Sequence, residues 1–161
     1  MVLAFRKGFQ EVRILIDRQL VKVLLSLLLC AFILGCVVAY IKDYTPKSPE
    51  EGAVKTALIA FETAWNMQEE KAILALLDED FVVWVWSGSN RRLVFTKGTF
   101  GFRLWITFVR WRYLSLGMPE IWIKGTEATA YLPMSVDGRG MRSTFRFINR
   151  EGTWLILEWE F

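Results

Sequence analysis

The sequence of 161 residues contains no histidine and only two cysteines. Zinc, copper and haem sites depend mainly on histidine and cysteine ligands, so the composition argues against all three. Cys30 and Cys36 both lie in an apolar segment, which leaves residues 43–161 without a disulfide and dependent on a hydrophobic core. We therefore expect no metal and no cofactor, although an all-carboxylate magnesium or calcium site stays open.

Residues 43–161 also lack an excess of either charge, with 14 basic and 15 acidic residues. The net charge of +3 comes from residues 1–42, which hold six basic and two acidic residues. A near-neutral region without a basic stripe does not favour nucleic-acid binding. We expect no nucleic-acid partner.

Residues 23–41 contain no charge, and Lys22 and Lys42 border them. At ~1.5 Å per residue, this segment approaches the ~30 Å of a bilayer's hydrocarbon core. Because lipid offers backbone groups no hydrogen bonds, the segment is predicted to be a single transmembrane helix. Basic residues are more frequent before it than after it. This bias predicts that residues 1–22 form a cytoplasmic tail at the inner membrane of a bacterium and that the C-terminal part is periplasmic.

A lipoprotein signal is the alternative interpretation of this segment. Ile33-Leu34-Gly35-Cys36 resembles a lipobox, in which Cys36 would be acylated. However, Leu34 stands where a small or β-branched residue is usual, and residues 37–41 stay apolar. The charged region of residues 1–22 is also long for a signal peptide. Both interpretations place residues 43–161 outside the cytoplasm.

After a polar linker at residues 42–52, residues 53–161 have the length of one domain. Apolar residues at helical spacing predict a first helix: Val54, Leu58, Phe61 and Trp65. A short second helix is predicted to end at Asp78-Glu79-Asp80, and a strand at residues 81–86 is predicted to end in the polar segment 87–90. Residues 98–111 predict a third helix.

From Tyr113 onward the apolar residues recur with period two, which predicts four strands with turns at residues 125–126, 137–140 and 150–152. In the third of these strands one face is expected to hold Met141, Ser143, Phe145 and Phe147. In the last strand, Leu155, Leu157, Trp159 and Phe161 are expected to face the core, opposite Trp154 and Ile156. This alternation indicates an antiparallel sheet with one face on a core.

Three segments together resemble the nuclear-transport-factor-2-like (NTF2-like) superfamily, in particular its polyketide-cyclase-like branch. They are Ala64-Trp65-Asn66, the residues from Leu77 to Phe81, and Gly152-Thr153-Trp154. The resemblance covers residues 53–161. It implies an α+β fold in which a curved antiparallel sheet is wrapped by three helices into a cone, with a pocket or a dimer surface in the concavity. Here the single transmembrane helix precedes this domain.

The residues used by enzymes of this superfamily are missing. Those enzymes use an Asp with a Tyr, or a His with an Asp, whereas this chain has no histidine and no tyrosine on its first helix. Adjacent carboxylates such as Asp78, Glu79 and Asp80 can act as acid and base, but acids at a helix end are usually solvated, so we expect no catalytic residue. Arg91 and Arg92 are candidates for an anion contact, and an exposed loop pair is the simpler interpretation.

All eight tryptophans lie in residues 65–159, and a domain of this size cannot easily bury them all. Trp105, Phe108 and Trp111 have helical spacing, for which a core position is the favoured interpretation. The candidate pocket or interface aromatics are Trp65, Trp84, Trp86, Trp105, Trp111 and Trp154.

We therefore expect a non-catalytic, membrane-anchored subunit. Its exported domain would dock partner proteins of a membrane complex, or a second copy of itself, through aromatic surface. The alternative is a small enzyme or carrier that binds a hydrophobic small molecule in the cone-shaped pocket.

Overall fold

The computed structural model describes residues 39–87 and 89–161. The predicted cytoplasmic tail, most of the predicted transmembrane helix and Cys36 lie outside these residues. Across the described ranges, no helix is long and apolar enough to cross a membrane. In chain order the elements are η1 (Ile41–Asp43), α2 (Pro49–Asn66), α3 (Glu70–Ala75), β1 (Leu77–Ser87), β2 (Asn90–Thr96), α4 (Lys97–Arg110), β3 (Leu114–Leu116), β4 (Glu120–Lys124), β5 (Glu127–Val136), β6 (Arg139–Arg150) and β7 (Thr153–Glu160).

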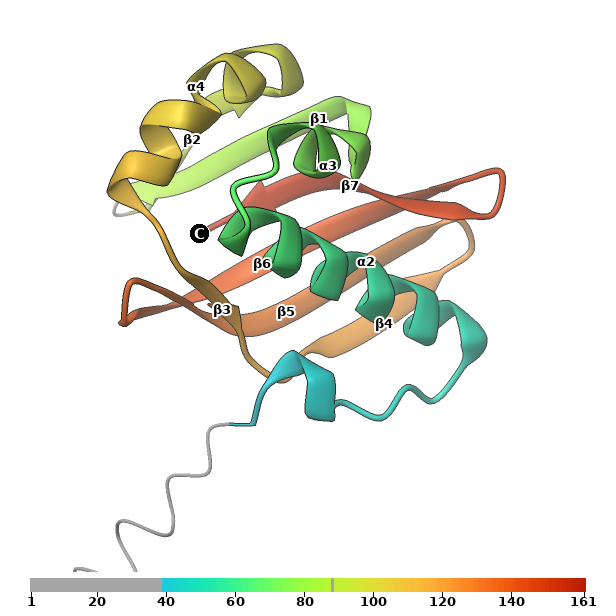
Figure 1. Cartoon of the computed structure of the whole chain (residues 1–161). Coiled ribbons are helices and arrows are strands. Elements are labelled where there is room, and N and C mark those ends of the chain that lie inside the picture. Colours follow the sequence, from blue (N-terminus) through green and yellow to red (C-terminus); the bar gives the residue numbers. More distant parts are fainter. Residues whose placement is uncertain (1–38, 88) are drawn as a thin grey trace, which may run out of the picture. The chain divides into compact units, whose positions relative to one another are not determined.

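The strands form one sheet in the order β2-β1-β7-β6-β5-β3, and β4 also pairs with β5. β1 and β7 are parallel, whereas the other pairs are antiparallel. Figure 1 shows α2 lying across the curved sheet, with α4 at the end formed by β1 and β2. The predicted α+β architecture, a curved sheet with three helices, is confirmed.

Helix α2 forms as its apolar spacing predicts. Ser48 caps its start by accepting a hydrogen bond from the Glu51 N–H at 3.2 Å. The side chains that share its inner face are all 0% exposed: Val54, Leu58, Phe61 and Trp65. This face forms the centre of the hydrophobic core.

The C-terminal end of α2 also covers the outer edge of β3. The Asn66 side chain donates to the Leu114 carbonyl and accepts from the Leu114 N–H, both at 2.8 Å. Glu62 accepts from the Leu116 N–H at 2.9 Å. These side chains provide the hydrogen bonds that a further strand would otherwise make.

Two predicted boundaries in the first half of the domain are wrong. Helix α3 ends at Ala75, so Asp78, Glu79 and Asp80 lie in β1 rather than at a helix end. The extended conformation begins early because Leu77 already pairs with Ile156 of the central strand β7. The polar segment after β1 leads directly into β2, so Arg91 and Arg92 are strand residues rather than a loop pair.

The predicted face of β7 is correct in its second half and wrong in its first half. Phe147 pairs with Ile156 but Arg146 pairs with Glu158, so a β-bulge leaves Leu157 unpaired and inverts the alternation. Trp154 is consequently only 5% exposed, on the same core side as Trp159 at 2%. On β6 the predicted inward face is confirmed for Ser143, Phe145 and Phe147, whereas Met141 is 36% exposed.

The domain extends further toward the N-terminus than the predicted boundary at residue 53. Ile41 is 1% exposed and belongs to the core, and the Ala39 carbonyl accepts a hydrogen bond from the Met118 N–H at 3.0 Å. Lys55 donates to the Tyr44 carbonyl at 2.6 Å. The segment predicted as a linker, residues 42–52, therefore contains part of η1 and the first turn of α2. The last three residues of the predicted membrane span belong to the domain, although Tyr40, which forms a β-bridge with Gly117, is 42% exposed.

Candidate functional site

Helix α4 is the element whose side chains depart most from ordinary burial. Its start is fixed by the Thr96 N–H, which donates to the Thr99 hydroxyl at 2.9 Å. Its inner face packs Phe100, Leu104 and Phe108 into the core. Helix α3 approaches closely, since a Cβ placed on Gly101 would lie 3.3 Å from both terminal methyl carbons of Leu74.

The opposite face of α4 is apolar as well, and it is exposed. Phe102 is 79% exposed, Trp105 62%, Ile106 39% and Val109 67%. These residues have the spacing i, i+3, i+4, i+7 and form one continuous stripe, which we call the α4 stripe. A soluble surface rarely leaves such a patch open without a binding role.

A groove lies beside the α4 stripe. Its volume is about 620 Å³ and its lining combines residues of α4, of the following connection, and of the α2–α3 turn and the start of α3. The lining residues are Asn66, Gln68, Glu70, Trp105, Phe108, Val109, Arg112 and Tyr113. Two residues of the stripe therefore form one wall of a mixed polar and apolar depression.

The part of the sequence that contains the stripe carries charge of one sign only. Residues 81–119 contain no acidic residue and six basic ones: Arg91, Arg92, Lys97, Arg103, Arg110 and Arg112. Arg103 and Arg110 are seven residues apart and lie on one side of α4, next to Ile106. The stripe is thus bordered by two arginines along one edge and by the groove with Glu70 along the other.

The interior of the cone is filled by aromatic side chains. The ring centroid of Trp159 lies 5.6 Å from those of Phe61 and Phe145 and 5.7 Å from that of Trp65. The Trp159 indole donates to the Ser143 hydroxyl at 2.8 Å, and that hydroxyl donates to the Glu160 carbonyl at 2.9 Å. The indole N–H of Trp159 and the hydroxyl of Ser143 therefore both have hydrogen-bond partners among protein atoms.

The six candidate tryptophans separate into three groups. Trp65 and Trp154 are core residues at 0% and 5% exposure, so neither lines an open pocket or an interface in this domain. Trp105 and Trp111 are 62% and 38% exposed, so the core interpretation of their helical spacing is wrong for both and correct only for Phe108. The remaining two are on β1.

The tryptophans of β1 belong to a charged cluster on the outer face of the sheet. The Arg91 guanidinium lies 4.2 Å from the ring centroid of Trp84 and pairs with Glu158 at 2.9 Å and Glu160 at 2.8 Å. Trp86 donates to Glu160 at 2.7 Å. Both arginines are exposed, and the Arg91 charge is already matched by carboxylates of β7.

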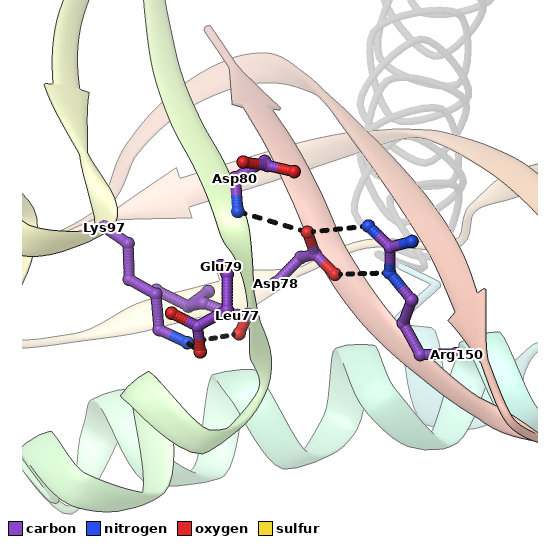
Figure 2. A network of polar contacts seen from close by, with 6 residues as sticks. All are labelled: Leu77, Asp78, Glu79, Asp80, Lys97 and Arg150. Atoms are coloured by element: carbon purple, nitrogen blue, oxygen red, sulfur yellow. Dashed lines mark hydrogen bonds and ion pairs between the residues drawn. The ribbon is translucent and has the colours of Figure 1, made fainter.

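The acidic triplet forms two separate ion pairs, which Figure 2 shows. Asp78 is 3% exposed and accepts from Arg150 Nε at 3.0 Å and from a terminal guanidinium nitrogen at 3.3 Å. Lys97 Nζ contacts Glu79 at 2.8 Å and the Leu77 carbonyl at 2.8 Å. The hydrogen bonds from Arg150 lower the pKa of Asp78, so this carboxylate is held ionised and is poorly suited to donate a proton.

Glu62 is a partly buried acidic residue that the sequence pattern does not reveal. Burial raises the pKa of Glu62, and the hydrogen bond from the Leu116 N–H opposes this rise. No periodic signal marks it, because it lies beside the predicted inner face of α2. Within residues 39–87 and 89–161, no three His, Cys, Asp or Glu residues form a group that could hold a metal ion.

The arrangement of the sheet and helices matches many solved structures. An NTF2-like protein from Cytophaga hutchinsonii superposes with a TM-score of 0.60 at 15% identity, covering 70% of this chain and 97% of that one. The domain has the NTF2-like fold. A second NTF2-like protein, from Shewanella baltica, gives a TM-score of 0.59 at 14% identity over 73% of this chain and 95% of that one.

A third match, from Shewanella frigidimarina, is described as a candidate ketosteroid isomerase, with a TM-score of 0.54 at 15% identity over 67% of this chain and 93% of that one. At these identities the likeness concerns the fold alone. No family model and no curated protein matches the sequence.

Proposed function

We propose that this chain is a non-catalytic, membrane-anchored assembly subunit whose exported domain docks partner proteins through the α4 stripe. The observation that supports this most is the exposure of Phe102, Trp105 and Val109 on one helix face. Aromatic residues rimmed by arginine are the side chains that protein interfaces favour.

The anchoring part of the proposal depends on residues 1–38, because residues 39–41 belong to the domain. The uncharged residues 23–38 and their basic N-terminal flank favour a single-pass helix at the inner membrane, with the domain on the periplasmic side. Acylation of Cys36 would provide the alternative anchor and keep the domain on the same side.

The non-catalytic part rests on the filled interior of the cone. The rings of Trp65 and Phe145 pack against Trp159 in the core, and the buried carboxylate of Asp78 is paired with Arg150, which supports this part of the proposal. A second candidate function is the binding of a hydrophobic small molecule. The groove of about 620 Å³, with Trp105, Val109 and Tyr113 in its lining, favours it, and such a ligand would bind there rather than in the cone.

Site-specific photocross-linking in the source cells tests the docking function. A photoreactive phenylalanine at position 105 should form adducts with proteins of the membrane fraction. The same group at position 122, where Trp122 is 55% exposed on β4, serves as the control. Equal labelling at both positions, or recovery of the chain from the soluble fraction, would contradict the proposal.

Native mass spectrometry of the full-length chain in mild detergent separates the two candidate functions. An assembly subunit should appear in a discrete larger complex. A carrier should instead appear with an additional mass of a few hundred daltons, roughly that of a drug-sized ligand, which the change Val109→Glu in the groove would remove.

A further inference from the structure

We infer that the α4 stripe binds a second copy of this chain, with the two α4 helices side by side and parallel about a two-fold axis. This inference rests on the proposed docking function and names its partner. It is carried by the size of the exposed apolar surface, by the distribution of charge along its two edges, and by the position of α4 in the domain.

The exposed apolar area is close to what one partner contributes to a stable interface. Besides the four residues of the stripe, Tyr113, which lines the groove with Trp105 and Val109, is 69% exposed. Together these five side chains expose on the order of 600 Å², since an aromatic residue has ~150–250 Å² to bury. A standard interface buries about 800 Å² on each partner.

Charge on the two edges decides how two copies can meet. Arg103 and Arg110 lie along one edge of the stripe, and Glu70 faces the other edge across the groove. A two-fold axis perpendicular to α4 would pair the helices in antiparallel fashion and bring arginine against arginine. An axis parallel to α4 instead brings the arginine edge of each copy against the Glu70 edge of the other.

The positions of Glu70 and Arg110 along the axis of α4 agree with the parallel arrangement. Glu70 lines the groove together with Val109, and Arg110 is the next residue of α4 after Val109. In the parallel pair equal residue numbers face each other, so Arg110 of one copy lies level with Glu70 of the other. The groove is also lined by Arg112, and Glu70 is the acidic residue of its lining. Glu70 is therefore the lining residue that can pair with an arginine of the second copy.

The position of α4 leaves room for this partner. Figure 1 shows α4 at one end of the domain and the segment around Ile41 at the opposite end. The first described residues, from Ala39 to Asp43, therefore lie away from the stripe. Residues 1–38 carry five basic and two acidic residues, so their charge does not complement the arginine edge.

The oligomeric state of the full-length chain is the first measurement. Sedimentation equilibrium in a mild, density-matched detergent should give a dimer. Trp105→Glu should raise its dissociation constant at least about thirty-fold. Trp122→Glu is the matched control, because it introduces the same charge at a tryptophan of similar exposure on β4, and it should leave the dissociation constant unchanged.

A charge exchange tests the edge pairing. Arg110→Glu alone and Glu70→Arg alone should each weaken the dimer by about three-fold to ten-fold, and the double variant should restore it. Failure of the double variant to recover affinity would overturn the pairing of these edges.

Cysteine cross-linking tests the parallel direction in a chain with Cys30→Ala and Cys36→Ala. Val109→Cys should form an intermolecular disulfide with itself, whereas Trp122→Cys should not. A disulfide that requires Phe102→Cys on one copy and Val109→Cys on the other would show an antiparallel pair and overturn the proposal.

The oligomeric state and the cross-linking at position 105 together separate this inference from the proposed docking function. A monomer, or a dimer that Trp105→Glu leaves intact, overturns the second copy as the occupant of the stripe. If position 105 still cross-links to other proteins in that case, the docking function stands without this inference. If position 105 labels nothing, both fall.

Discussion

The two faces of α4 have almost the same composition and opposite environments. Phe100, Leu104 and Phe108 are nearly fully buried against the sheet and α3. Phe102, two residues after Phe100, and Val109, directly after Phe108, are more than 60% exposed. Apolar character alone therefore does not identify a core position. The inner face stabilises the fold, and the outer face has no such role to explain it.

A matched pair of phenylalanines on α4 gives the largest expected difference. Phe100→Ala should lower the free energy of unfolding by about 3–5 kcal/mol, because it removes a ring that is 2% exposed. Phe102→Ala should change it by less than about 0.5 kcal/mol. Chemical denaturation followed by circular dichroism measures both. Similar losses for the two variants would mean that the outer face also contributes to the fold.

The same comparison extends to the two tryptophans of β7. Trp154→Ala should cost about 3 kcal/mol or more, close to the loss expected for Trp159→Ala, because the bulge at Leu157 turns both side chains into the core. Trp122→Ala, on an exposed site of β4, is the control and should cost little. A stable Trp154→Ala variant would show that the bulge does not persist in solution.

Crowding at the contact between α3 and α4 should have a smaller effect. Gly101→Val places side-chain atoms against Leu74 and should cost about 1–3 kcal/mol. Gly98 has open space around it, so Gly98→Ala should instead be neutral or stabilise the helix by up to about 1 kcal/mol. Thermal unfolding of the two variants distinguishes a close contact from ordinary helix propensity.

The pH dependence sharpens the comparison further. The pKa of Asp78 is lowered from 3.8 by Arg150, so its contribution to stability is present above that pH and is lost as the pH falls through the lowered pKa. The stability gap between the wild type and Asp78→Asn should therefore shrink in acid. The gap between Phe100→Ala and Phe102→Ala should stay constant, since α4 contains no acidic residue. Urea titrations at pH 7 and pH 3 measure both gaps.

The sequence was sufficient where a simple period governs burial. The spacing of Val54, Leu58 and Phe61 predicted the inner face of α2, and the polar turns predicted the hairpins after β4, β5 and β6. The turns of the last two hairpins use left-handed residues such as Gly138 and Gly152, which Asp-Gly and Glu-Gly pairs permit.

Prediction failed where the period is interrupted or absent. A single unpaired residue, Leu157, inverted the face of Trp154. β2 is exposed on both faces, so Arg91 and Arg92 carried no alternation that could mark a strand. The helical spacing of Trp105, Phe108 and Trp111 predicted a core face rather than the α4 stripe, because a helix with apolar residues nearly all round gives no indication of which face a partner covers.

The burial of Ile41 has a practical consequence for any fragment of this protein. A recombinant fragment that starts at residue 53, at the apparent beginning of the domain, would lack an isoleucine that is 1% exposed and the carbonyls of residues 42 and 44 that Lys55 contacts. It would leave a hole in the core and should aggregate on expression. A fragment that starts at Ala39 keeps every core residue that the structure describes, and a protease that trims the chain beyond this boundary should unfold the domain.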